Sequence, residues 1–377
     1  MSSHRRGILS ILGISDSLDL SKETVAEVML SWNAVDFETE AAKRGMCATA
    51  LRSFQEWDQH PHAQAMTNVL PVTIRKVGEA PKREMKSNIT RPLDKVRVLD
   101  LSRVLAGPVA GRTLAAHGAD VLLVTSPNLP SLPFLDIETS LGKRTTQLDL
   151  TQESDHASLI DLARDCDVFL QAYRPGGLEA KGFGVDDLVK LRPGIVCASL
   201  NAWGWEGPWK DRKGFDSLVQ TATGFNFEEG KAYHEYMLSH AELGVKSSFA
   251  PKPFPMQTLD YAAGYFLAFG INAALARTMT EGGSWEVRVS LAAVGQWLRS
   301  LGRVSPEEAF GNGMGKFPST SDDEEISKLS TTWPSVAGDG RSITGLRHPA
   351  VLSGAPVRQG DSGVAPMVLN ANSACWL

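Results

Sequence analysis

The chain has 377 residues, of which 42% are hydrophobic and 21% charged, and its formal net charge is −5. This length can bury a large core and hold about two domains, and the composition is that of an ordinary globular protein. Without a basic excess, nucleic acid is not expected as a partner, although a local basic pocket could still bind a small anion.

The four cysteines are far apart in the sequence and show no metal-type spacing. Cys166 and Cys197 fall in apolar segments and are expected in the core, so we predict no metal site. This cysteine usage indicates a reduced, intracellular protein of the cytoplasm, with the mitochondrion and peroxisome as alternatives. No apolar run approaches the ~20 residues needed to span a bilayer, so no membrane is predicted as a partner. The first twenty residues do not fit a secretory signal but leave a transit peptide open.

The first ninety residues precede the regular alternation of strands and helices that begins near residue 91. Residues 20–60 are expected to form helices, the segment LPVTIRKVGEAP (70–81) a strand, and residues 82–92 a polar linker.

The stretch VRVLDLSRVLAGPVAGRTLAAHGADVLLV (96–124) is the most informative part of the sequence. Its short apolar runs are separated by one helix length, which is typical of a βαβ unit in a parallel sheet. Ligands bind such sheets at the carboxyl ends of the strands, here the loop SRVLAGP. The loop lacks the G-x-G-x-x-G pattern, so NAD is disfavoured. We expect a strand over 96–101, a loop over 102–108, a helix over 109–117 and a strand over 119–124.

The same alternation continues along the chain. It predicts an open parallel Rossmann-like α/β sheet with helices on both faces, plus a small α+β domain. Residues 225–255 are expected to be irregular, and residues 305–340 poorly ordered. Further strands are expected at 145–150, 167–173, 195–204 and 284–291, and helices at 154–166, 185–194, 215–224, 260–278 and 292–301. The expected segments are 1–90 (small-domain-like, with a linker), 91–304 (large domain) and 305–377 (C-terminal, partly disordered).

Asp260 precedes a helix rich in small apolar residues. As an N-cap it would accept backbone N–H bonds and suit the helix dipole. A carboxylate in this place can also be a nucleophile that attacks an activated acyl group and forms a mixed anhydride. The two interpretations are compatible.

Basic residues follow or precede the buried strands. Arg174 and Lys181 stand in the glycine-rich turn AYRPGGLEAKGFG (172–184), where they could bind phosphate or remain solvated surface charges. Lys143 and Arg144 precede another strand, and surface solvation is the default interpretation for both.

The loop SLNAWGWEGPW (199–209) carries three tryptophans. It could stack on an adenine, cover an acyl chain, or pack inward as a rigid loop.

Taken together, the segments resemble the class III CoA-transferases, also called the CaiB/BaiF family. The resemblance covers about residues 91–300 in family order. It is carried by RPLDKVRVLDLSRVLAGPVAGRTLAAHGADVLLV, GKRTTQLDL, the segment 167–209, RKGFDSLVQTATG, TLDYAAGY and GGSWEVRVSL.

The resemblance implies that Asp260 is the nucleophile. It implies a CoA cleft built from Arg103, Val104, Leu105, Ala106, Tyr173, Arg174 and Lys181, with Lys143 and Arg144 of GKRTTQLDL as further candidate contacts. The implied activity moves CoA from an acyl-CoA donor to a carboxylic acid acceptor through an aspartyl anhydride and an aspartyl-CoA thioester. CoA is then a substrate, no cofactor is permanently bound, and the family's architecture is an interlocked homodimer.

Two alternatives remain. Family racemases acting on α-methylacyl-CoA add a histidine where this chain has Phe215, before Asp216, so transferase chemistry is preferred and Asp216 is taken as structural. A non-catalytic CoA-binding homologue is the other alternative, since about ninety residues that resemble the family's small domain precede the βαβ unit. The chain therefore resembles the later part of a longer, tandem or permuted arrangement.

Overall fold

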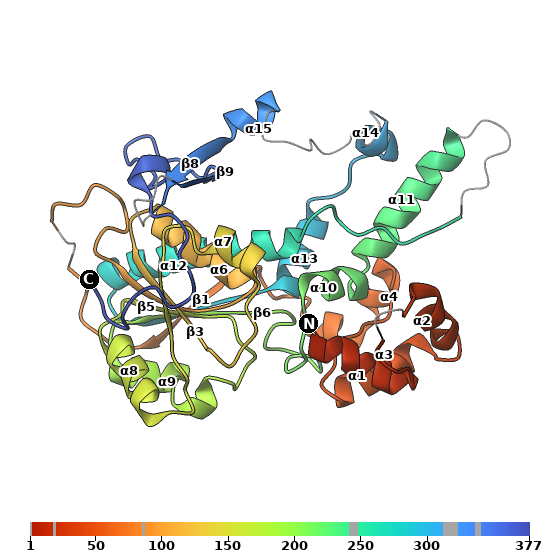
Figure 1. The fold of residues 1–377 in the computed structure, drawn as a ribbon, viewed down its shortest axis with the longest axis horizontal. Coiled ribbons are helices and arrows are strands. Elements are labelled where there is room, and N and C mark those ends of the chain that lie inside the picture. The colour runs from red at the N-terminus through yellow and green to blue at the C-terminus, as the bar shows by residue number, and fades with distance from the viewer. Residues whose placement is uncertain (1, 18–19, 85–86, 241–247, 312–322, 336–340) are drawn as a thin grey trace. The chain divides into compact units, whose positions relative to one another are not determined.

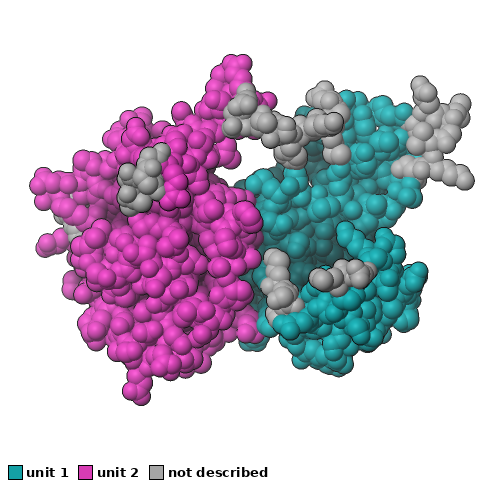
Figure 2. All heavy atoms as spheres, viewed as in Figure 1, with its two compact units in different colours: residues 1–70, 201–259, 290–315 teal, residues 71–200, 260–289, 316–377 magenta. Residues whose placement is uncertain are grey.

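The computed structural model describes residues 2–17, 20–84, 87–240, 248–311, 323–335 and 341–377. The chain folds into two compact units, which Figure 2 shows in different colours. Each unit is assembled from three separate stretches, so the units differ from the three consecutive segments expected from the sequence. Unit 1 comprises residues 1–70, 201–259 and 290–315, and unit 2 comprises residues 71–200, 260–289 and 316–377.

Unit 2 is built on a seven-stranded sheet with the order β1-β7-β6-β5-β2-β3-β4 (Figure 1). The strands β6, β5, β2, β3 and β4 pair in parallel, which confirms the expected parallel sheet. At the other edge β1 pairs with β7 in antiparallel fashion, so the sheet is mixed. The strands are β1 (Thr73–Gly78), β2 (Arg97–Leu101), β3 (Asp120–Thr125), β4 (Arg144–Gln147), β5 (Val168–Gln171), β6 (Val196–Asn201) and β7 (Ser284–Ser290).

Helices cover both faces of this sheet (Figure 1). The side chains of β2 alternate: Leu99 and Leu101 join a buried cluster with Leu159 of α8, while Asp100 faces Gly111 of α6. The expected α/β sheet with helices on both faces is therefore confirmed, whereas the elements described for unit 1 are helical and not those of the expected small α+β domain. The helices of unit 2 are α6 (Ala106–Ala116), α7 (Pro133–Thr139), α8 (Glu153–Arg164), η1 (Glu179–Lys181), α9 (Val185–Leu191), α15 (Glu324–Lys328), η2 (Gly360–Ser362) and all but the first two residues of α12 (Thr258–Thr280).

The strand order reverses at β2. From β2 the chain moves to β3 on one side, and it later returns to place β5 on the other side. In open α/β sheets this reversal opens a crevice at the carboxyl ends of the two strands, here beyond Leu101 and Gln171. The loop after β2 and the loop after β5 therefore meet at the place where a ligand is expected.

The elements described for unit 1 are helices. A 15-residue helix, α11, occupies part of the stretch that the sequence suggested was irregular, so that expectation is wrong there. Its neighbour α10 begins at Asp216, close to the expected start. The helices are α1 (Ser2–Leu12), α2 (Lys22–Met29), α3 (Ala34–Lys43), α4 (Phe54–Asp58), α5 (Pro61–Ala65), α10 (Asp216–Ala222), α11 (Phe225–Ser239), α13 (Leu291–Ser300) and α14 (Pro306–Phe310).

The C-terminal part of unit 2 packs on the large sheet. The antiparallel hairpin β8 (Ser330–Pro334) and β9 (Ser342–Leu346) precedes a segment that runs along the edge strand β4. There the side-chain oxygens of Asn372 and Asn370 accept hydrogen bonds from the backbone N–H groups of Thr145 and Gln147. The segment thus covers donors that an edge strand otherwise exposes. Within residues 305–340 the structure describes α14, α15 and β8, which are regular; residues 312–322 and 336–340 lie outside the described part.

Among the described residues one helix, α12, is long and apolar enough to cross a membrane, which corrects the expectation that no such run exists. Half of its most apolar window is buried in the protein, as in the core helix of a globular fold. Groups of three or more histidine, cysteine or acidic residues placed to hold a metal ion are not found in the described part of the chain.

Candidate CoA site

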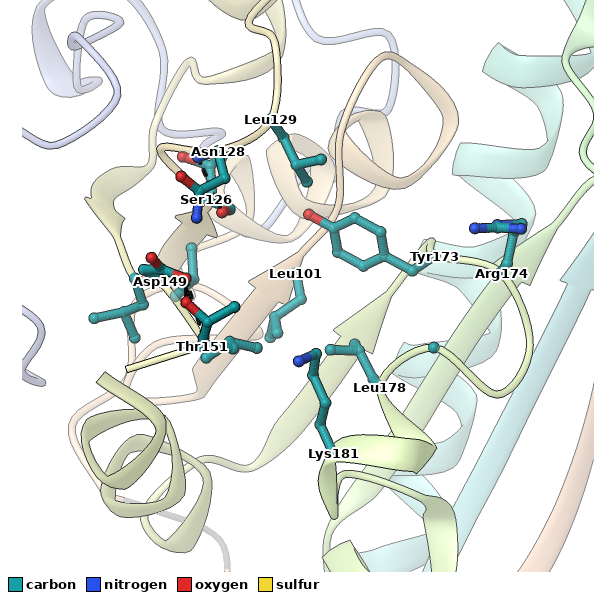
Figure 3. Close-up of a pocket in the computed structure, with 15 residues that line it drawn as sticks. Leu101, Ser126, Asn128, Leu129, Asp149, Thr151, Tyr173, Arg174, Leu178 and Lys181 are labelled. Atoms are coloured by element: carbon teal, nitrogen blue, oxygen red, sulfur yellow. Dashed lines mark hydrogen bonds between the residues drawn. The ribbon is translucent and has the colours of Figure 1, made fainter. Parts of the chain in front are cut away.

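A cavity of about 310 Å³ opens at the carboxyl ends of the parallel strands of unit 2 (Figure 3). Its size is at the lower end of that of small-molecule sites, and its wall is mainly apolar with a few polar groups. Leu101 at the end of β2 and the loops after β3, β4 and β5 contribute to it, as the crevice rule for parallel sheets predicts. It is lined by Leu101, Val124, Thr125, Ser126, Asn128, Leu129, Leu148, Asp149, Leu150, Thr151, Tyr173, Arg174, Gly177, Leu178 and Lys181.

Three of the residues chosen from the sequence line this cavity: Tyr173, Arg174 and Lys181. The Tyr173 ring extends toward Leu129, and the Lys181 ammonium group toward Leu101, while Arg174 lies beyond Tyr173, away from Asp149 (Figure 3). Burial raises the pKa of Tyr173 to about 12, so the phenol stays neutral and can donate or accept a hydrogen bond. Arg174 and Lys181 are exposed cations that line a mainly apolar cavity. This arrangement suits a ligand with an aromatic or apolar body and anionic groups.

Sequence reasoning missed the opposite wall. Asp149 and Thr151 follow β4, and Asn128 follows β3. The backbone N–H and the hydroxyl of Thr151 donate to Asp149 Oδ1 at 3.0 and 2.7 Å, and these bonds hold the pKa of that carboxyl below its ordinary value. An ionised carboxylate here can accept hydrogen bonds from hydroxyl groups. The rule that located the loop after β2 also applies to β3 and β4, and would have found these residues.

The loop after β2 leads into the N-terminus of α6. The helix begins at Ala106, three residues earlier than expected, and its N-cap residue Leu105 offers no side-chain cap. Arg103 donates to the carbonyl oxygen of Pro130, and Val104 has a φ of +71°, which is unusual for a non-glycine residue. None of the four predicted residues 103–106 lines the cavity of about 310 Å³. They border the crevice at the strand-order reversal instead.

Gly107 allows α6 to approach the ends of both strands at this crevice. A Cβ atom at Gly107 would lie 2.5 Å from the Cβ of Ser102 after β2, and 2.7 Å from the Cβ of Ala172 after β5. A side chain therefore does not fit without moving one of the two loops. The close approach brings the helix N-terminus, where N–H groups favour negative charge, to the carboxyl ends of the strands.

Asp260 is the third residue of α12, inside the first turn and not at the N-cap. It is half-buried, and the positive end of the helix dipole favours its charged form. Gly264 stands one turn later on the same face of the helix, because residues four apart lie above one another. A Cβ atom at Gly264 would lie 2.7 Å from the carbonyl oxygen of Ala106 and 2.8 Å from Val109. The face that carries Asp260 therefore packs on the first turn of α6.

Side-chain bonds fix this end of α12. The Tyr261 hydroxyl donates to Glu138 Oε2 at 2.9 Å, and Glu138 Oε1 accepts from Arg112 at 2.6 Å. Arg112 also contacts the Tyr265 hydroxyl at 3.5 Å. Residues of α6, α7 and α12 thus hold the residue next to Asp260 in place.

Lys143 and Arg144 are placed differently from the expectation. Lys143 is completely buried and pairs with Asp100, so its interpretation as a solvated surface charge is wrong. Arg144 forms a two-bond pair with Asp120 at the amino end of β3, with N–O distances of 3.0 Å, and donates to the carbonyl of Cys375. Neither side chain lines the cavity, and the structure engages both with partners of the protein itself.

The remaining candidates pack inward; Trp203, Trp209 and Asp216 belong to unit 1, and Cys166 and Cys197 to unit 2. Trp203 and Trp209 are buried against Trp57 and His62, so the loop 199–209 is a rigid, inward-packed loop at these two positions. Asp216 is fully buried and accepts a hydrogen bond from Gln220, in agreement with a structural role. Cys166 and Cys197 are buried, as expected.

Comparisons with known proteins identify the family of the chain. Residues 93–316 match the CoA-transferase family III. An acetyl-coenzyme A transferase, nodX, of Hypoxylon pulicicidum is 35% identical over 221 residues, which cover 57% of this chain and 35% of that protein. A probable fatty acyl-CoA transferase of Mycobacterium tuberculosis is 33% identical over 245 residues, which cover 59% of this chain and 57% of that protein. The crystal structure of a variant of the mycobacterial protein shares the fold, with a TM-score of 0.55 at 24% identity over 74% of this chain and 96% of that chain.

More than half of the chain matches the family, so this protein belongs to CoA-transferase family III. The resemblance seen in the sequence is thereby confirmed. The chain spans 35% and 57% of the length of the two curated relatives named above.

Proposed function

We propose that unit 2 binds the CoA part of an acyl-CoA at the carboxyl ends of its parallel strands, and that Asp260 is the nucleophile of a CoA transfer between two carboxylic acids. The observation that carries the proposal is the placement of Tyr173, Arg174 and Lys181 in one cavity of a family III chain. The cavity is mainly apolar and is lined by two cations, which suits a nucleotide with phosphates.

Each group has a physical role in this proposal. The apolar wall with Leu101 and Tyr173 receives the base, and the Asp149 carboxylate accepts bonds from ribose hydroxyls. Arg174 and Lys181 bind the phosphates through charge-assisted hydrogen bonds. The uncapped N-terminus of α6 favours negative charge near the loop after β2, toward which the thioester end of the extended molecule is directed.

The proposed reaction proceeds through Asp260. The carboxylate attacks the thioester carbonyl of the donor, which forms an aspartyl anhydride and releases the CoA thiolate. The thiolate attacks the Asp260 carbonyl, forms an aspartyl-CoA thioester and releases the donor acid. The acceptor carboxylate then attacks this thioester, forms a second aspartyl anhydride and again releases the thiolate. Attack of the thiolate on the acceptor's acyl carbonyl gives the new acyl-CoA and regenerates the Asp260 carboxylate. Membership of the family implies an interlocked homodimer as the working assembly.

A CoA-binding homologue without turnover is the second candidate, because the chain spans only part of its longer relatives. A racemase is disfavoured because Phe215 cannot act as the second acid or base for proton transfer at an α-carbon.

The test measures two quantities on the full chain: CoA affinity by calorimetry, and exchange of CoA between an acyl-CoA and a panel of labelled carboxylic acids. The proposal expects both binding and exchange, with exchange lost in Asp260→Ala. The matched control is Asp186→Asn, which alters an exposed carboxylate that also lies in the first turn of a helix. Binding without exchange would support the non-catalytic homologue, and full exchange in Asp260→Ala would overturn the mechanism.

A further inference from the structure

A second, much smaller cavity lies between α6 and the segment after β9, away from the candidate CoA site. Its volume is about 20 Å³, and it is lined by several residues that include Arg112, His348, Arg358 and Gln359. A space of this size holds one water molecule or a single ion of similar size. All of these residues belong to unit 2.

Two buried nitrogen atoms at this cavity have no hydrogen-bond partner in the part of the chain that the structure describes: Arg112 Nε and His348 Nε2. The arginine Nε always carries a hydrogen. His348 Nδ1 lies 3.2 Å from both the backbone nitrogen and the carbonyl oxygen of Ala350, and in the tautomer in which Nδ1 accepts from the N–H, Nε2 carries the ring hydrogen. His348 is only 7% exposed. In that tautomer two N–H donors line one small cavity and lack an acceptor, which is costly unless something fills it.

The charges around the cavity are unbalanced. Arg112 pairs with Glu138, but Arg358 donates only to the carbonyl of Gly118, at 3.3 Å, and has no carboxylate within ion-pair distance among the described residues. The His117 ring lies edge-on to His348, with the ring centroids 5.1 Å apart. Burial lowers the pKa of His348 to about 4, a backbone hydrogen bond with Ala350 opposes this, and the positive fields of His117 and Arg112 add to the lowering, so the ring is neutral at pH 7. The cavity thus has surplus positive charge and unsatisfied donors.

We propose that this cavity binds a single small monovalent anion of the chloride class, held by Arg112 Nε, His348 Nε2 and the guanidinium group of Arg358. A water molecule would also fit, but it would leave the charge of Arg358 without a counterion. The anion joins α6 to the C-terminal segment, because Arg112 belongs to the first and His348 and Arg358 to the second. Through Arg112, Glu138 and Tyr261 it is connected to the residue beside Asp260.

The solution test is thermal unfolding of the full chain in mixtures of chloride and gluconate at constant ionic strength. Anion binding to the folded state predicts that Tm rises steadily with chloride concentration. Arg358→Gln should weaken the apparent chloride affinity about tenfold, the loss expected for one charge-assisted hydrogen bond. Arg164→Gln removes the same charge from an exposed arginine and should respond to chloride like the wild type.

Crystals grown with bromide provide a test that needs no variant. The proposal expects an anomalous peak within hydrogen-bond distance of both Arg112 Nε and His348 Nε2. Density for a water molecule alone, together with a Tm that does not depend on chloride, would overturn it. An equal chloride response in Arg358→Gln and Arg164→Gln would overturn it as well. Neither readout depends on CoA transfer, so this inference stands or fails separately from the proposed function.

Discussion

The Nζ atom of Lys143 lies 2.8 Å from Oδ2 of Asp100, and both side chains are completely buried. Nζ also donates to the carbonyl of Pro108 at 2.9 Å, and Ser102 Oγ donates to the other oxygen of Asp100 at 2.5 Å. Burial lowers the pKa of Lys143, and the opposite charge of Asp100 counteracts this. The ion pair therefore joins the start of β4, the end of β2 and the first turn of α6, and through Ser102 it reaches the loop that borders the crevice.

Lys143→Met should reduce the free energy of unfolding by about 3–5 kcal/mol, because it leaves the Asp100 carboxylate buried without its counterion. The double variant Lys143→Met/Asp100→Asn should recover most of this loss, since the buried charge is then gone. Urea unfolding of both variants measures the effect. Arg164→Gln, which breaks an exposed pair, should change stability by less than about 1 kcal/mol. Equal losses in the buried and exposed cases would contradict the account.

Gly111→Ala should destabilise unit 2, since a Cβ atom there would lie 2.2 Å from Asp100 Oδ2 and 2.8 Å from Lys143 Nζ. Overpacking of this kind costs about 1–3 kcal/mol, and a disturbed ion pair adds to it. Gly354→Ala is the matched control because nothing lies within 4 Å of its Cβ position. Thermal unfolding should show a lower Tm for Gly111→Ala only. If both variants lower Tm by the same small amount, α6 can move away from the Asp100–Lys143 ion pair, and the prediction is wrong.

Lowering the pH should reduce the stability of unit 1, because His62 is buried in its neutral form. Its Nδ1 accepts from the backbone N–H of Trp209 at 3.2 Å, and its Nε2 donates to the carbonyl of Trp203 at 2.9 Å. Burial lowers the pKa of this ring from 6.5 to about 4. In the unfolded chain His62 is therefore protonated below about pH 6.5, whereas in the folded protein it stays neutral down to about pH 4. The free energy of unfolding therefore falls as the pH drops from about 6.5 toward 4.

The loss from His62 should reach about 3 kcal/mol at pH 4, at 1.36 kcal/mol for each pKa unit. His62→Gln should flatten this part of the stability profile, while His234→Gln, at a half-exposed position of α11, should not. His348 contributes in the same direction, so some slope remains in His62→Gln. Denaturant unfolding at several pH values gives the comparison, and an unchanged profile in His62→Gln would refute this explanation.

Lys181→Gln should weaken CoA binding about tenfold, because the variant loses a charge-assisted bond to phosphate. Lys190→Gln, an exposed lysine of α9 that does not line the cavity, is the control for the change in net charge. Calorimetric titration with CoA measures the affinity of both variants and of the wild type. If the two variants bind CoA equally well, the phosphates do not lie at Lys181.

Much of the fold could be read from the sequence where the pattern is local. The short apolar runs of β2 and β3 and the helix between them predicted a parallel sheet, and the crevice rule then pointed to the loop after β2. The pairing of β1 with β7 could not be predicted in this way, because antiparallel neighbours more than two hundred residues apart leave no local pattern.

The sequence predicted site residues correctly where a charged or aromatic side chain also follows a buried strand. It failed where only one of these two signs was present. Tyr173, Arg174 and Lys181 follow one strand and line one cavity. Lys143 has the same charge, but its side chain reaches inward to Asp100, a contact that depends on Gly111 in another element. Asp149 and Thr151 were not predicted because the candidate phosphate ligands were basic residues. The ends of β3 and β4 nevertheless lie at the same edge of the sheet.

The most direct test of the central claim is to trap the covalent intermediate on Asp260. The chain is incubated with an acyl-CoA and hydroxylamine, digested, and the peptide that contains Asp260 is analysed by mass spectrometry. Hydroxylamine attacks an aspartyl-CoA thioester and releases CoA, so the account predicts an aspartyl hydroxamate at Asp260. The product should require the acyl-CoA and be absent when free CoA is used. An unmodified Asp260 in a chain that still exchanges CoA would contradict the account.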